Sequence, residues 1–113
     1  MKVSLNTKGA KGLGNAIKNA ANKEKIAAVV RFHTGELAEK SQRKVPVDTG
    51  HLKRSMITEV SADGEEGTVK YTADYAGYIE KGTRFMPAQP YLEPALNEVR
   101  EKFLEDLAKV GEG

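Results

Sequence analysis

The clearest pattern in this 113-residue chain is an apolar stripe near its C-terminal end. Successive members of the stripe are four, three, four, four and three residues apart: Leu92, Leu96, Val99, Phe103, Leu107 and Val110. This spacing places all of them on one face of an α-helix, and charged residues occupy the other faces. The pattern predicts an amphipathic helix whose stripe packs on a core.

A second, longer segment, residues 13–44, is rich in Ala, Lys and Glu and contains no proline. A thin stripe of apolar and small residues recurs in it at helical spacing: Leu13, Ile17, Ala20, Ala27, Val30, Thr34, Leu37 and Ser41. Gly35 costs about 1 kcal/mol in a helix interior, and Thr34 can cap a new helix. The segment therefore forms either one long helix or two helices divided near Gly35.

A short break follows this helical segment. Pro46 cannot continue a helix and disfavours helical geometry in the residue before it. Asp48 or Thr49 can cap a short turn over Gly50, and Leu52 can pin that turn to the core. Asp-Thr-Gly is also found in the catalytic loop of aspartic proteases, where two aspartates must meet and share a proton. Because the chain lacks the apolar segments that hold such a loop, we interpret the break as a fold-defining corner.

Two segments, 56–61 and 68–73, then alternate between apolar and polar residues around the turn sequence Ala-Asp-Gly-Glu-Glu-Gly. This arrangement predicts an antiparallel hairpin. A third short strand is predicted for residues 75–82, where Tyr78 and Glu80 would share one face.

The predicted fold class is α+β, with a long N-terminal helix, a small antiparallel sheet made of a hairpin and a third strand, and a C-terminal amphipathic helix packed on the sheet. Residues 1–12 are polar and rich in Lys and Gly, which predicts a flexible N-terminal arm. Residues 13–113 are expected to form a single domain, which suits a chain of this length.

Composition excludes several kinds of site. The chain has no cysteine, so it forms neither disulfides nor thiolate metal sites. His33 and His51 alone cannot make a zinc site, and both are expected at the surface or half-buried. No serine lies in a Gly-x-Ser-x-Gly context, and the glycines of residues 9–14 lack the Lys-Ser/Thr ending of a phosphate loop. We find no apolar run of signal-peptide or membrane-span length, and therefore expect a soluble protein made in the cytoplasm.

The net charge of +2 conceals an asymmetry along the chain. Residues 1–54 hold 12 basic and 4 acidic residues, whereas residues 55–113 hold 6 basic and 12 acidic residues. This distribution fits two solvated faces of opposite sign, head-to-tail stacking of copies, or a basic face near nucleic acid.

Residues 82–90 read as a loop, punctuated by glycine and two prolines. Glu80, just before it, is either a solvated acid or a structural acid. In the second case it accepts hydrogen bonds from the backbone of the following loop or from an arginine such as Arg54 or Arg84. Phe85 either packs into the core or belongs to a partner-binding loop, because Arg, Phe and Met are enriched at interfaces. The candidate interface comprises Arg84, Phe85, Met86, Pro87, Gln89 and Tyr91.

Three segments in order, VPVDTGHLKRSM, YAGYIEKGT and PAQPYLEPAL, resemble the tail-completion or head–tail joining proteins of long-tailed bacteriophages and prophages. The first segment matches through Pro46, Asp48, Thr49, Gly50, Leu52 and Ser55. The second matches through Tyr75, Ala76, Tyr78, Glu80, Gly82 and Thr83. The third matches through Pro87 or Ala88, followed by Pro90, Tyr91, Leu92, Pro94 and Ala95.

The resemblance implies a non-enzymatic structural protein without a cofactor, located in the virion neck and in the host cytoplasm before assembly. It implies a ring of copies between the head connector and the tail tube or tail terminator proteins, through which DNA passes without sequence-specific contact. It also implies a set of fold-defining residues: Pro46, Asp48, Thr49, Gly50, Leu52, Tyr78, Glu80, Gly82, Thr83 and Pro90. Two alternatives remain: a small basic-faced nucleic-acid-binding module and a hydrolase built on Asp48.

Overall fold

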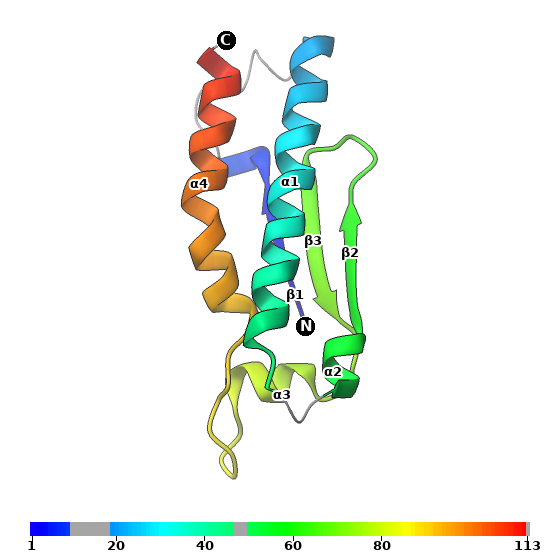
Figure 1. Ribbon diagram of the computed structural model, residues 1–113, viewed down its shortest axis with the longest axis vertical. Coiled ribbons are helices and arrows are strands. Elements are labelled where there is room, and N and C mark those ends of the chain that lie inside the picture. The colour runs from blue at the N-terminus through cyan, green and yellow to red at the C-terminus, as the bar shows by residue number, and fades with distance from the viewer. Residues whose placement is uncertain (10–18, 47–49, 113) are drawn as a thin grey trace.

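The computed structural model describes residues 1–9, 19–46 and 50–112. It is an elongated α+β structure with extents of 50 × 21 × 18 Å, in which helices cover one face of a sheet (Figure 1). The predicted fold class is confirmed. The elements follow in the order β1 (Lys2–Asn6), η1 (Thr7–Gly9), α1 (Ala20–Lys44), α2 (Gly50–Arg54), β2 (Met56–Val60), β3 (Glu66–Tyr71), α3 (Ala76–Lys81) and α4 (Leu92–Glu112).

The sheet has three antiparallel strands in the order β1-β3-β2. The β2–β3 hairpin is the predicted one, but the third strand is β1, which pairs Val3 with Val69 and Leu5 with Gly67. The prediction of a flexible N-terminal arm is therefore wrong for Lys2–Asn6; residues 10–12 of that arm lie outside the described residues. Val3 and Leu5 alternate with polar neighbours as a half-buried strand requires, but two apolar positions are a weak signal beside the Lys- and Gly-rich sequence that follows.

The prediction of a strand over residues 75–82 is also wrong, because this segment contains helix α3. Ala76 and Glu80 are four residues apart and both are buried, whereas Tyr78 is 61% exposed. Tyr78 and Glu80 therefore lie on different faces of a helix instead of sharing one face of a strand.

α1 and α4 lie side by side and run in opposite directions over the sheet (Figure 1). The stripe of α4 is buried from Leu92 to Leu107, as predicted, and Val110 is partly buried against the core. α1 is one continuous helix through Gly35. Asn19 caps it by accepting a hydrogen bond from the Ala21 N–H at 2.9 Å. The predicted helical residues 13–18 lie outside the described part of the chain.

The corner after α1 follows the expected path where it is described. Val45 has extended backbone angles (φ −64°, ψ 130°), and α1 ends two residues before Pro46. Leu52, on α2, is fully buried. The proposed capping residues Asp48 and Thr49 lie outside the described residues.

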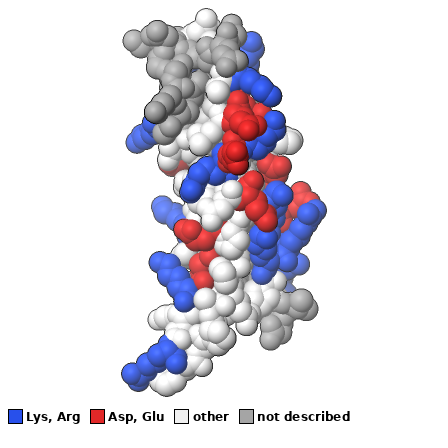
Figure 2. Space-filling view, turned by 90° about the vertical axis from the view of Figure 1, so that its left-hand side faces the viewer, with Lys and Arg blue, Asp and Glu red and all other residues white. Residues whose placement is uncertain are grey.

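Charged residues of the two halves of the sequence meet between α1 and α4. The Lys44 and Lys40 ammonium groups lie 3.2 and 4.0 Å from the Glu98 carboxylate. Basic and acidic side chains consequently interleave along the face shown in Figure 2. On that face the charge asymmetry of the sequence does not become two separate patches, because the basic and acidic helices are neighbours.

Among residues 1–9, 19–46 and 50–112, none of the helices combines the length and the apolar composition that a membrane span requires.

Candidate functional site

The lower end of the molecule in Figure 1 is formed by the loop between α3 and α4, which we call the tip loop (residues 82–90). Within it, Thr83 and Met86 pair through two backbone hydrogen bonds of 2.9 and 3.2 Å. The Thr83 hydroxyl accepts a third hydrogen bond from the Phe85 N–H at 3.1 Å. The tip loop therefore contains a closed turn with Arg84 and Phe85 at its apex.

The apex presents apolar surface to solvent. The Phe85 side chain is 84% exposed, the largest exposure among the large hydrophobic residues described. Met86, the next residue, is 37% exposed, and the Arg84 guanidinium carbon lies 4.7 Å from the centre of the Phe85 ring. Tyr78 on α3 is exposed as well. Phe85 therefore does not pack into the core, which was one of the two interpretations that the sequence left open. The exposed ring, with Arg84 and Met86 beside it on a hydrogen-bonded turn, makes this apex a candidate contact surface.

Glu80 holds the base of the tip loop. Its side chain is 4% exposed, and its Oε1 accepts hydrogen bonds from the N–H groups of Tyr91 (3.1 Å) and Leu92 (2.7 Å). Its Oε2 accepts a third hydrogen bond from the Glu93 N–H at 3.1 Å. Of the two interpretations of Glu80, a solvated acid or a structural acid, the structure therefore supports the second. Its hydrogen-bond donors are backbone N–H groups at the start of α4. A carboxylate there also complements the positive end of the helix dipole.

Two further contacts fix where the loop leaves and rejoins the body. The Gln89 N–H donates to the Ile79 carbonyl at 2.8 Å. Gly82 has φ +78° and ψ 175°, and a Cβ atom added there would lie 2.7 Å from the Ala88 nitrogen. A backbone in this region favours glycine. Gly82 therefore lets the chain leave α3 and pass close to the backbone of Ala88 at the other end of the loop.

The structure separates the predicted interface residues into two groups. Arg84, Phe85, Met86, Pro87 and Gln89 are exposed on the tip loop, and Pro90 is exposed beside them. Tyr91 is fully buried instead, and its hydroxyl donates to the Ala76 carbonyl at 3.0 Å. Burial and the nearby Glu80 carboxylate raise the pKa of Tyr91. Tyr91 is therefore an anchor of the loop and is left out of the candidate surface.

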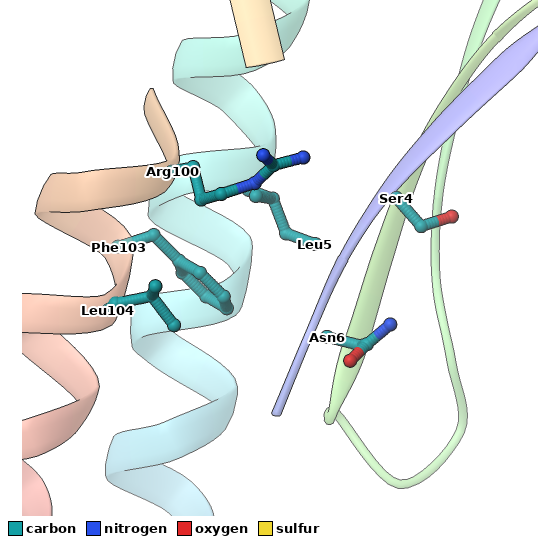
Figure 3. Close-up of a pocket in the computed structure, with 6 residues that line it drawn as sticks. All are labelled: Ser4, Leu5, Asn6, Arg100, Phe103 and Leu104. Atoms are coloured by element: carbon teal, nitrogen blue, oxygen red, sulfur yellow. The ribbon is translucent and has the colours of Figure 1, made fainter. Parts of the chain in front are cut away.

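A shallow groove lies between β1 and α4 (Figure 3). Its volume is about 240 Å³, and it is lined by Ser4, Leu5, Asn6, Arg100, Phe103 and Leu104. Leu5 points from β1 toward Phe103, while the Arg100 side chain reaches from α4 toward the strand (Figure 3). Within the described ranges, no three His, Cys, Asp or Glu side chains lie close enough together to hold a metal ion.

The cluster that most resembles a catalytic group surrounds His33, which the sequence predicted at the surface or half-buried. His33 is 1% exposed, so that prediction is wrong. Its Nδ1 lies 2.8 Å from a Glu36 carboxylate oxygen, and its Nε2 lies 2.6 Å from an Asp106 carboxylate oxygen. The hydrogen bond from His33 and the charge of Lys102 hold the pKa of Asp106 below its usual value. With Phe103 edge-on to the imidazole at 5.8 Å, the cluster joins α1 to α4 and presents no nucleophile.

Asp106→Asn is expected to lower the free energy of unfolding by about 1 kcal/mol at pH 7, because a charge-assisted hydrogen bond to a buried ring is weakened and Asp106 is a quarter exposed. A carboxyl with a depressed folded-state pKa stabilises the fold above its ordinary pKa of about 3.9 and loses that contribution as pH falls. The difference between the two proteins in urea unfolding should therefore shrink as the pH falls below about 3.9. Glu101→Gln, on the exposed side of α4, is the control and should show no such pH dependence; a pH-independent difference for Asp106→Asn would contradict the assignment.

Comparison with known proteins gave one match. The model of the family described as "Bacteriophage HK97-gp10, putative tail-component" matches residues 8–82, which is 75 of the 113 residues. The match includes α1, the corner, the hairpin and α3, and it ends where the tip loop begins. Neither the curated proteins nor the solved structures contained a match.

Proposed function

The chain belongs to the HK97-gp10-like family of phage tail components, and from this premise we propose that it is a structural protein of the virion neck. In this proposal it completes the tail or joins it to the head connector, without catalysis or a cofactor. The observation that carries the proposal is the tip loop, which presents Phe85 on a closed turn anchored by Glu80.

The tip loop suits contact with a neighbouring virion protein. Burial of a Phe side chain contributes about 1.5–3 kcal/mol, and the hydrogen-bonded turn limits the entropy lost on binding. We propose that the head connector, the tail tube or the tail terminator provides the complementary surface. Before assembly the protein resides in the host cytoplasm.

We further propose that copies of the chain form a ring in the virion, with DNA passing through its centre without sequence-specific contact. A closed ring requires that one surface of each copy bind a different surface of the next copy. The sheet supports this proposal because it ends in two different edge strands, β1 and β2.

The alternative of a basic-faced nucleic-acid-binding module has less support. Lys40 and Lys44 lie against Glu98, and acidic side chains interrupt the basic ones over the face in Figure 2. A surface of this kind does not offer the continuous positive stripe that tracks a phosphate backbone.

Electron microscopy of lysates tests the neck function directly. A phage or prophage from which this one gene has been deleted is compared with its parent. We expect filled heads and finished tails lying apart in the deletion lysate, with joining restored when the gene is supplied from a plasmid. Normally joined particles without the gene would contradict the proposal.

Phe85→Ser is expected to leave the fold unchanged but to weaken partner binding by about 10- to 100-fold, because the ring is exposed in the free chain and buried in the complex. The measurement is particle joining and infectivity when the variant complements the deletion, with thermal unfolding of the purified chain alongside. Phe32→Ser is the matched control, since Phe32 is a second exposed phenylalanine, 66% accessible on α1. Full complementation by Phe85→Ser would remove the tip loop from the interface.

A further inference from the structure

The two edge strands of the sheet point in the same direction. β1 and β2 are each antiparallel to the central strand β3, so they are parallel to each other. The described residues supply no strand beyond either of them. β2 carries neither lysine nor proline, the residues that commonly protect an edge strand from pairing with another chain.

Backbone hydrogen bonds at the strand ends show which groups of β2 are free. Ser61 N–H donates to the Glu66 carbonyl at 2.8 Å, and Thr72 N–H donates to the Ser55 carbonyl at 3.2 Å. Bonded and non-bonded residues alternate in an antiparallel ladder. Odd-numbered residues of β2 therefore bond to β3, and the N–H and C=O groups of Met56, Thr58 and Val60 point away from the sheet.

The same alternation applies to β1. Tyr71 N–H donates to the Met1 carbonyl at 2.9 Å, and Thr7 N–H donates to the Glu65 carbonyl at 3.2 Å. Odd-numbered residues of β1 thus bond to β3. The backbone groups of Lys2, Ser4 and Asn6 point outward.

We propose that β2 of one copy adds in parallel to β1 of the next copy, so that the three-stranded sheets join into one continuous sheet around the ring. This inference rests on the proposed ring and identifies the surfaces that close it. The occupant of each open edge is a second copy of this chain.

The register of the sheet fits this arrangement. In a closed ring all copies lie at the same height. Thr58 and Val3 are both paired with Val69, so they lie at the same height on the two edges. In a parallel ladder a residue bonds to the neighbours on either side of the residue opposite it. The backbone of Thr58 would therefore form hydrogen bonds to the backbones of Lys2 and Ser4 of the next copy. These are residues whose N–H and C=O groups point away from β3.

Side chains on the helix-facing side of the sheet also complement each other. Val60 and Leu5 share a height because both pair with Gly67, so Val60 would lie beside Leu5 of the next copy. Val60 is 40% exposed in the single chain, and Leu104 at the groove between β1 and α4 is 38% exposed. The groove in Figure 3 has room for an apolar side chain of this size. Joining the strands would thus cover apolar surface from both copies.

Charges on the other side of the sheet favour the same pairing. Glu59 and Lys2 are both exposed on the face away from the helices. Within one copy the Glu59 carboxylate already lies 2.9 Å from the Lys70 ammonium group. In the proposed register Glu59 lies opposite Ser4 of the next copy and diagonal to Lys2 of that copy, which would add a second cation beside this pair. A two-fold pairing of β2 with β2 would lack this contact and would end after two copies.

Cysteine cross-linking tests the pairing, because the natural chain has no cysteine. Ser4→Cys and Glu59→Cys are combined in one chain. Within a copy both positions pair with Thr68, so they are two strand spacings, about 10 Å, apart and cannot form a disulfide. Between joined copies they are one spacing apart. We expect a ladder of disulfide-linked oligomers on non-reducing gels, from the concentrated purified chain and from purified tails, and no ladder from either single variant.

Thr58→Pro added to the double variant provides a second readout. Proline at position 58 removes an N–H group that points away from the sheet, and it breaks no hydrogen bond to β3. The thermal unfolding transition should therefore be retained, while the disulfide-linked ladder is lost. Asn6→Pro on the opposite edge, which leaves the cysteine at position 4 in place, serves the same purpose if Thr58→Pro does not fold. Absence of the ladder in both preparations, or disulfide dimers from Glu59→Cys alone, would overturn the proposal. Cross-linking of the purified chain does not depend on where the protein acts, so it can fail or succeed independently of the deletion phenotype.

Discussion

Replacement of Glu80 by alanine is expected to lower the free energy of unfolding by about 4 kcal/mol. Three backbone N–H groups at the start of α4 donate to this carboxylate, and those of Tyr91 and Leu92 are buried. Each hydrogen bond to a charged group contributes about 1.5–3 kcal/mol, and an unsatisfied buried donor carries a further penalty. Water that reaches the partly exposed Glu93 N–H offsets part of this loss.

The measurement is urea unfolding of the purified chain, followed by circular dichroism. Glu80→Gln keeps one carbonyl oxygen that can accept from the N–H groups of Tyr91 and Leu92, but it places an NH₂ group near the Glu93 N–H. This variant should therefore lower the free energy of unfolding by about 2 kcal/mol. Glu93→Gln, which changes an exposed carboxylate at the same helix end, should stay within about 0.5 kcal/mol of wild type. A Glu80→Ala protein that loses less than about 1 kcal/mol would show that other groups cap α4.

The role of Glu80 was only partly readable from the sequence. Gln89, Pro90 and Tyr91 precede α4, and none of them is a residue type that caps a helix well. The lack of a good capping residue before α4 indicates that the cap comes from elsewhere in the chain. The choice of Glu80 depends on α3 lying beside the start of α4, which local sequence does not reveal.

Elements with a long periodic pattern, or with a turn signal between two alternating segments, were predictable, whereas α3 and β1 were not. The stripe of α4 covers five turns and fixes which residues are buried. α3 has six residues, too few to show a helical period, so its sequence predicts a strand instead. β1 offers two apolar positions and finds its partner, β3, about sixty residues later. Pairing at this separation is settled by tertiary packing.

Individual side chains show the same limit. His33 is buried because Asp106, 73 residues later, lies against it on α4. Tyr91 and Phe85 are both aromatic residues of one loop region, yet one is fully buried and the other is 84% exposed. Residue type identified the loop as a candidate surface, whereas orientation decided which residues belong to it.

Gly67→Ala is expected to lower the free energy of unfolding by about 3 kcal/mol. α1 crosses β3 at this glycine, and an added Cβ would lie 1.7 Å from the Thr34 Oγ1 and 2.9 Å from the Thr34 Cβ. The Thr34 hydroxyl is itself held by a hydrogen bond to the Val30 carbonyl at 2.7 Å, so it does not move away freely. Overpacking of a close contact costs about 1–3 kcal/mol, and here backbone must shift as well.

Two further variants separate this clash from a general effect of alanine. Gly35→Ala, in the interior of α1 with nothing within 4 Å of the added Cβ, should stabilise the protein by about 0.5–1 kcal/mol. Thr34→Ala combined with Gly67→Ala should recover about half of the loss, because the hydroxyl is removed while the Cβ contact remains. Chemical unfolding of the wild type, Thr34→Ala, Gly67→Ala and the double variant gives the coupling energy. Strictly additive effects of the two substitutions would mean that the crossing of α1 and β3 does not depend on this contact, and that another contact sets the distance between the helices and the sheet.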